Sequence, residues 1–118
     1  ALGIWDKVGD FRNAARLVDE RYPGMHIVHT VNNACLTVFA LALGGRDVGR
    51  VFAEAVAMAH DADCTAATAG SIACYGIDAL DEHWYKPFGD KVNSYFHGPK
   101  EYRISELLEG FEKFSGVR

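Results

Sequence analysis

The sequence predicts a soluble all-α protein of about six helices in one compact, bundle-like unit, and three observations lead to this prediction. Apolar residues recur at helical spacing through most of the chain. Residues that typically begin or end helices separate these apolar runs. Apolar residues make up 49% and charged residues 24% of the 118 residues, which is the balance of an ordinary globular protein. We therefore expect a single helical domain over residues 1–118.

The first two predicted helices lie on either side of a segment with an ambiguous pattern. An amphipathic helix is predicted before residues 22–24 (Tyr-Pro-Gly) from five apolar residues at helical spacing: Ile4, Val8, Phe11, Ala15 and Val18. Residues 26–31 could form a short β-strand, but a single strand without a partner is not expected to persist. Residues 31–43 are apolar on nearly every face, which predicts a buried helix that ends at Gly44 and Gly45.

Four further helices are predicted in the rest of the chain. Asp47 can cap a helix with one apolar side, formed by Val48, Val51, Phe52, Ala55 and Val56. A polar break at residues 60–63 precedes a helix of small residues that runs from Thr65 and ends at Gly76. Asp78 can cap a further, short helix. The last helix has a single apolar stripe, formed by Ile104, Leu107, Leu108, Phe111 and Phe114.

Charge and hydropathy argue against two classes of partner. The chain has 12 Lys+Arg against 16 Asp+Glu, a net charge of −4. We therefore expect no nucleic-acid partner, because nucleic-acid binding depends on a basic surface. The longest apolar run, residues 35–45, is far shorter than a membrane span, so no membrane partner is expected.

Cysteine usage and the first residues indicate a compartment. Cys35, Cys64 and Cys74 cannot all pair within one chain, and none belongs to a Cys-x-x-Cys motif. A reducing compartment is the simplest fit. The N-terminal segment already carries charged residues such as Asp6 and Asp10, so no signal peptide is visible. A cytoplasmic location is expected.

The clearest chemical signal is the pair of carboxylates in residues 61–64, Asp-Ala-Asp-Cys. Hard cations such as Mg²⁺ and Ca²⁺ require several oxygen ligands, and side chains in a turn can converge on one point. The alternative is that Asp63 is a helix N-cap and Asp61 a solvated turn residue. His60 could likewise be a metal ligand or a base, or a loop histidine that is exposed by chance. Cys64 could be a nucleophile beside His60, but no third, orienting group is evident.

Residues 61–72, Asp-Ala-Asp-Cys-Thr-Ala-Ala-Thr-Ala-Gly-Ser-Ile, resemble the C-terminal signature of the ADP-ribosylglycohydrolase family, in which an Asp-x-Asp-Thr or Asp-x-Asp-Cys turn opens a helix of small residues. Residues 29–34 (His-Thr-Val-Asn-Asn-Ala) and 45–48 (Gly-Arg-Asp-Val) are similar to the preceding helix and loop of that family. Residues 77–80 (Ile-Asp-Ala-Leu) and 103–107 (Arg-Ile-Ser-Glu-Leu) are similar to its closing segments. The motifs occur in the order found in the family.

This resemblance, over roughly residues 22–110, implies an all-α hydrolase that cleaves the N- or O-glycosidic bond between ADP-ribose and an ADP-ribosylated acceptor. The family uses two Mg²⁺ ions, and the turn supplies three ligands, which correspond here to Asp61, Asp63 and Cys64. The two carboxylates would be the catalytic residues, because the metal site positions or activates water. Three further residues would either form a polar rim near the substrate or cap the start of the buried helix: His29, Asn32 and Asn33.

The sequence also departs from the family pattern. It has no Thr-Asp-Asp motif, which supplies the other metal ligands in complete members, and Ala59 and His60 replace the usual pair of glycines. We therefore expect the chain to carry only the C-terminal half of the metal site, as a truncated relative that is inactive in isolation. The alternative function is a non-catalytic helical module, a homo-oligomer that self-associates through the helices at residues 31–43 and from Thr65.

Overall fold

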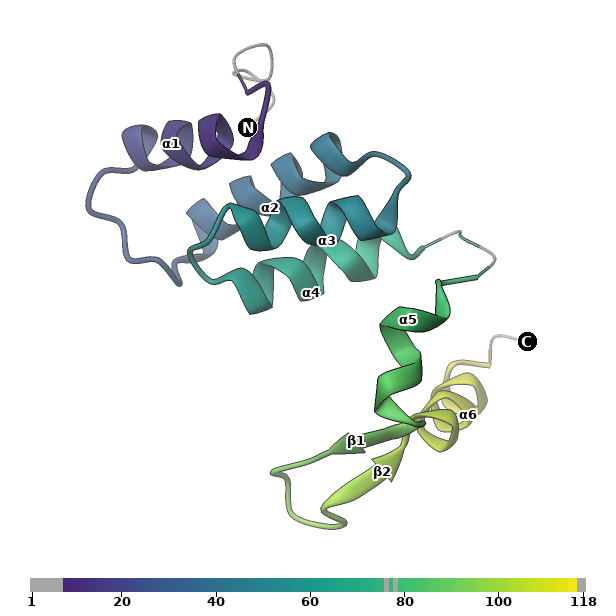
Figure 1. Cartoon of the computed structure of the whole chain (residues 1–118). Helices are drawn as coiled ribbons and strands as arrows, with labels where there is room; N and C mark the ends of the chain where they lie inside the picture. The colour runs from purple at the N-terminus through teal and green to yellow at the C-terminus, as the bar shows by residue number, and fades with distance from the viewer. Residues whose placement is uncertain (1–7, 76, 78, 117–118) are drawn as a thin grey trace. The chain divides into compact units, whose positions relative to one another are not determined.

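A computed structural model describes residues 8–75, 77 and 79–116, which group into two compact units (Figure 1). Unit 1 comprises residues 1–78 and unit 2 comprises residues 79–118. The described residues form six α-helices and one two-stranded hairpin, so the predicted helical class and helix number are confirmed. Two compact units can belong to one domain, so the single domain over residues 1–118 stays a prediction.

Unit 1 contains four helices: α1 (Phe11–Arg21), α2 (Thr30–Gly44), α3 (Val48–Ala57) and α4 (Ala62–Ala73). Helices α2, α3 and α4 lie side by side, and α1 contacts α2 and α3 (Figure 1). Helix α1 begins at Phe11, after the N-cap Asp10, whose side chain accepts a hydrogen bond from the amide of Asn13. The predicted helix began earlier, at Ile4, which lies outside the described residues.

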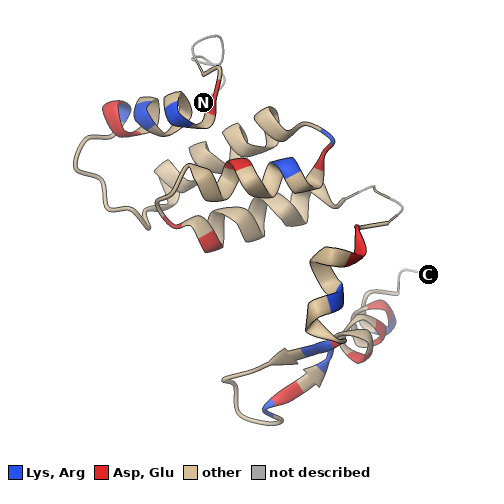
Figure 2. Cartoon of the chain, viewed as in Figure 1, with Lys and Arg blue, Asp and Glu red and all other residues tan. Residues whose placement is uncertain are grey.

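The ends of α2 and α3 agree with the predicted signals. Helix α2 ends at Gly44, and its C-cap Gly45 has a φ of +62°, a conformation that favours glycine. The side chain of Asp47 accepts a hydrogen bond from the amide of Arg50 and so caps α3. No strand forms in the ambiguous segment before α2, because its residues form turns that lead directly into Thr30. Figure 2 shows that α2 carries no charged residue. The prediction that α2 is buried on nearly every face is nevertheless only partly confirmed, because Val31 and Val38 are exposed.

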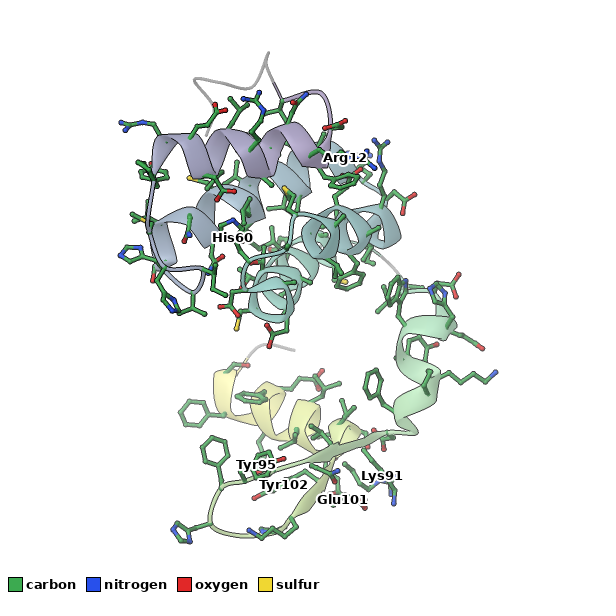
Figure 3. All side chains as sticks on the ribbon, turned by 60° about the vertical axis from the view of Figure 1, so that its left-hand side comes forward. Arg12, His60, Lys91, Tyr95, Glu101 and Tyr102 are labelled. Atoms are coloured by element: carbon green, nitrogen blue, oxygen red, sulfur yellow. The ribbon has the colours of Figure 1, made fainter. Side chains whose placement is uncertain are left out.

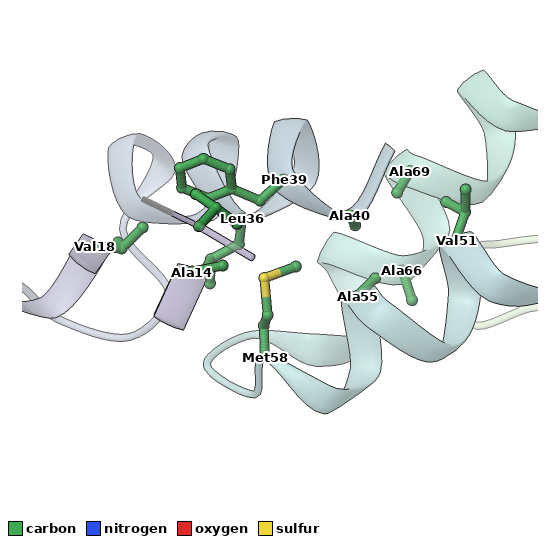
Figure 4. Close-up of a cluster of buried hydrophobic side chains, with 11 residues drawn as sticks. Ala14, Val18, Leu36, Phe39, Ala40, Val51, Ala55, Met58, Ala66 and Ala69 are labelled. Atoms are coloured by element: carbon green, nitrogen blue, oxygen red, sulfur yellow. The ribbon is translucent and has the colours of Figure 1, made fainter. Parts of the chain in front are cut away.

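The core of unit 1 lies among all four helices. Its fully buried side chains include Leu36 and Phe39 from α2 and Val51 from α3. Met58, which follows α3, is 1% exposed and lies between side chains of α1 and α2 on one side and of α3 and α4 on the other (Figure 4). Burial of apolar area is the main driving force for folding. The buried side chain of Met58 therefore anchors the turn between α3 and α4 to the core.

Unit 2 contains α5 (Glu82–Tyr85), the 3₁₀ segment η2 (Lys86–Phe88), β1 (Lys91–Asn93), β2 (Glu101–Arg103) and α6 (Ile104–Ser115). The predicted cap Asp78 lies outside the described residues, and α5 is capped by Asp81, which accepts a hydrogen bond from the amide of His83. Helix α6 forms as predicted. Its apolar stripe is nevertheless exposed, with Leu108 at 59% and Phe111 at 71%.

The hairpin was not predicted. Its strands are antiparallel, with Val92 opposite Tyr102, and an ion pair of 2.9 Å joins Lys91 to Glu101 (Figure 3). Each strand has only three residues, which is too short for an alternating pattern to be recognised in the sequence. Each described helix is also too short or too polar to traverse a lipid bilayer.

Asp90 connects the hairpin to the first turn of α6. Its Oδ1 accepts a hydrogen bond from the amide of Ser105 at 2.8 Å, and its Oδ2 accepts from the Ser105 hydroxyl at 2.8 Å and from Arg103 Nε at 3.1 Å. The hydrogen bonds from Ser105, and then the interaction with Arg103, hold the pKa of Asp90 below its ordinary value of 3.8. An aspartate distant in sequence thus serves as the helix cap.

We expect unit 2 to lose stability in acid through Asp90. Because the folded pKa lies below the unfolded value, ionised Asp90 stabilises the fold above the ordinary pKa of 3.8, and this stabilisation is lost as the pH falls through the lowered pKa. An NMR titration of the Ser105 amide should report this low pKa, and Asp90→Ala should abolish that titration and lower the urea midpoint at pH 7. Glu109→Ala, at an exposed carboxylate of α6, is the control and should do neither.

Candidate metal centre

The turn between α3 and α4 has an unusual backbone. Ala59 and His60 have φ angles of +61° and +59°, in the left-handed region that L-residues with a Cβ rarely adopt. Met58 anchors the turn in the core on one side, and Asp61 occupies the N-cap position of α4 on the other. The two left-handed residues therefore bring Asp61 directly to the start of the helix.

Asp61, Asp63 and Cys64 lie together at this helix start, as predicted. One ligand atom from each residue lies within 4.8 Å of the others. Among the described residues, neither carboxylate forms an ion pair with a basic side chain, and the Asp61 side chain makes no capping hydrogen bond. The alternative in which Asp63 is the N-cap is wrong, because α4 begins at Ala62 and Asp63 lies inside its first turn. The positive end of the helix dipole favours the two uncompensated charges there.

The thiol of Cys64 is not activated as a nucleophile. A hydrogen bond with Asp61 and then the negative charges of Asp61 and Asp63 raise the pKa of Cys64 above its ordinary value of 9.0. A high pKa keeps sulfur in the unreactive thiol form at neutral pH. The same two carboxylates would attract a cation, whose charge would favour the thiolate as a ligand.

A hollow of about 260 Å³ adjoins this cluster, between the first half of α2 and the start of α4. Asp61 and Cys64 contribute to its wall. The other residues that line it are Val28, Thr30, Asn33, Ala34, Thr37, Thr65 and Thr68. Two buried polar atoms of this wall, Asn33 Oδ1 and Thr65 Oγ1, have no hydrogen-bond partner. The hollow thus combines negative charge with unused hydrogen-bonding capacity.

The three residues predicted to contact substrate differ in their surroundings. His29 is the N-cap of α2, and its Nδ1 accepts a hydrogen bond from the amide of Val31. Asn32 is 2% exposed and donates to the carbonyl of His26, so both residues have the capping and hydrogen-bonding roles that were the alternative. Asn33 alone of the three lines the hollow. Contact of any of the three with substrate remains a prediction.

His60 is held inside unit 1, so the interpretation of an exposed loop histidine is wrong (Figure 3). Its side chain is 11% exposed, its Nε2 lies 2.9 Å from Asp19 Oδ1 of α1, and its Nδ1 lies 3.4 Å from Asn32 Nδ2 of α2. Since Asn32 Nδ2 can only donate, His60 Nδ1 is the acceptor and Nε2 carries the proton toward Asp19. His60 therefore ties the turn to two helices. The sequence contained no local signal for this role, because both partners are distant in the chain.

Replacing Ala59 by glycine is expected to stabilise unit 1 by about 1 kcal/mol, because glycine adopts the left-handed conformation without the steric cost of a Cβ. Thermal unfolding should show a higher Tm. Ala53→Gly, at an exposed position within α3, is the matched control and should lower stability by about 1 kcal/mol. Equal effects of the two substitutions would contradict the assigned backbone strain.

The fold and the site together define a helical protein with a carboxylate–thiol cluster at the start of a small-residue helix. The chain belongs to the ADP-ribosylglycohydrolase family, whose model matches residues 4–112. Searches of curated proteins and of solved structures each found no match to this chain. The family assignment confirms the resemblance inferred from the sequence motifs.

Proposed function

We propose that this chain supplies Asp61, Asp63 and Cys64 as ligands for a divalent cation in the hydrolysis of a glycosidic bond to ADP-ribose. The observation that supports this function is the convergence of their three ligand atoms within 4.8 Å, in a chain of the ADP-ribosylglycohydrolase family. The pair of carboxylates, which has no ion-pair partner in the described part of the chain, is a local negative charge that a cation would offset.

The donor set fits Mg²⁺ through its oxygen atoms. Mg²⁺ is usually held by one or two carboxylates and keeps several of its waters, which matches Asp61 and Asp63. The thiol of Cys64 is a softer ligand and better suited to Zn²⁺ than to Mg²⁺. A cation held there would supply Lewis-acid polarisation of the substrate. The chain itself holds Asp61 at the helix start and keeps the turn in position through His60.

Asn33 and the exposed threonines of the hollow, Thr30 and Thr68, would line the space that receives an ADP-ribosyl substrate beside this cluster. This role is supported by the shared wall that Asn33 forms with Asp61 and Cys64. His29 and Asn32 would act indirectly, by holding the start of α2 through their hydrogen bonds.

The proposed site is one half of a two-metal centre. The chain lacks the Thr-Asp-Asp motif that supplies the remaining ligands in complete family members. We therefore expect the purified 118-residue chain to bind Mg²⁺ weakly and to release little ADP-ribose from an ADP-ribosylated peptide. Calorimetric titration with Mg²⁺, followed by addition of ADP-ribose, tests the binding. Rapid metal-dependent release that Asp61→Ala abolishes would contradict the half-site assignment.

The alternative function, a self-associating helical module, is supported by exposed apolar side chains on the two helices concerned. Val31 and Val38 of α2 are 40% and 37% exposed, and Ile72 of α4 is 52% exposed, although Phe39 is buried within unit 1. Light scattering at micromolar concentration distinguishes the two functions, because a clean monomer mass would exclude the homo-oligomer.

The three cysteines are free, which supports a reducing compartment such as the cytoplasm.

A further inference from the structure

Two buried polar atoms in unit 1 are unpaired at the same place. Thr65 is 2% exposed, and its Oγ1 has no hydrogen-bond partner. Asn33 Oδ1 is also buried and unpaired, while Asn33 Nδ2 donates to the carbonyl of Ile27 at 3.0 Å, which fixes the orientation of the amide. Buried polar groups without partners are rare because each costs free energy, so two in one wall require an explanation.

The explanation lies in the hollow that both residues line together with Asp61 and Cys64. A hollow of about 260 Å³ has room for several water molecules, each of which occupies about 30 Å³ in the liquid. The unpaired atoms are oxygens, so they can accept hydrogen bonds from a ligand that presents O–H groups. The hydroxyl of Thr37, in the same wall, donates a hydrogen bond to the carbonyl of Asn33 at 2.9 Å, so it is not among the unpaired groups.

We propose that Asn33 Oδ1 and Thr65 Oγ1 accept hydrogen bonds from the hydration water of a divalent cation held by Asp61, Asp63 and Cys64. This inference rests on the proposed function and assigns two positioning residues to the same site. Hard cations retain several waters when few protein ligands are available, and those waters are strong hydrogen-bond donors. Outer-shell partners of this kind orient the bound species and contribute to metal affinity.

The test is a titration of the unmodified chain and its variants with Mn²⁺ alone, in which electron paramagnetic resonance measures the free ion. Thr65→Val keeps the shape of the side chain but removes the hydroxyl, and we expect about tenfold weaker Mn²⁺ binding. Thr65→Ser retains the hydroxyl and should restore the affinity to within about twofold of the unmodified chain. Ser71→Ala is the control on the same helix, because Ser71 also carries a hydroxyl group but is exposed and does not line the hollow. It should leave the affinity unchanged.

Thermal unfolding of Thr65→Val without the ion gives a second measurement, in which we expect a gain in stability and not a loss. Removal of a buried, unpaired hydroxyl should raise the Tm of Thr65→Val by roughly 4 °C, although its Mn²⁺ affinity falls. If Thr65→Val does not fold, Thr65→Ala replaces it in the same titration, with the same tenfold loss expected.

Three outcomes would overturn the inference. Unchanged Mn²⁺ binding by a folded hydroxyl-free variant would overturn the role of Thr65 while the metal site remains. An effect of Thr65→Val that occurs only when ribose is added would assign the unpaired oxygens to sugar hydroxyls instead of to hydration water. Absence of Mn²⁺ binding by the unmodified chain would overturn both this inference and the proposed metal site.

Discussion

Gly44→Ala should destabilise unit 1 by about 3 kcal/mol, at the upper end of the cost of overpacking, and lower the Tm by roughly 10 °C. A Cβ on Gly44 would lie 2.4 Å from Val51 Cγ2 and 2.6 Å from both the Cα and the amide nitrogen of Val51. The side chain of Val51 could rotate, but its backbone cannot move without separating α2 from α3. Urea and thermal unfolding of the purified variant measure the effect.

The same substitution elsewhere provides the controls. The three atoms nearest to a Cβ on Gly70 of α4 would all belong to the ring of Phe52, a side chain that can shift, so Gly70→Ala should cost less than Gly44→Ala. A Cβ on Gly110 of α6 would have no neighbour within 4 Å, so Gly110→Ala should stabilise its helix by about 1 kcal/mol. A Gly44→Ala variant as stable as Gly110→Ala would show that α2 and α3 do not approach each other closely.

Asp61→Asn and Asp63→Asn should each weaken the binding of Mg²⁺ and Mn²⁺ by about tenfold or more, since each removes one of the two charged oxygen ligands. Stability without the ion should change little, because neither carboxylate forms an ion pair among the described residues and Asp61 makes no capping bond. Asp61→Asn should also lower the pKa of Cys64 toward its ordinary value, which thiolate absorbance in a chain with Cys35 and Cys74 replaced by alanine can follow.

Asp47→Asn is the matched control for these substitutions. It removes the same charge at the start of α3, and asparagine is as effective an N-cap as aspartate. Ion affinity, stability and the pKa of Cys64 should therefore all stay close to those of the unmodified chain. If Asp47→Asn weakened ion binding as much as Asp63→Asn does, the effect would reflect net charge and not a site at α4.

The sequence by itself determined those features that depend on neighbouring residues. Gly45 and Asp47 mark the end of α2 and the start of α3, because a glycine C-cap with a positive φ and a side-chain N-cap are local interactions. The convergence of Asp61, Asp63 and Cys64 was also predictable, since residues within one helical turn lie close together. The family followed from the order of the motifs along the chain.

Only the tertiary structure decided the features that join distant segments. The cap on α6 comes from Asp90, which lies 15 residues before Ser105, and the hairpin strands are too short to leave a periodic pattern. His60 is only 11% exposed and is held by Asp19 and Asn32, which approach it from other helices. Thr65 is an ordinary helical threonine in the sequence, and its hydroxyl is buried without a hydrogen-bond partner because it lies where α2 and α4 pack together. Such contacts are selected by the packing of whole helices, which no local pattern of residues specifies.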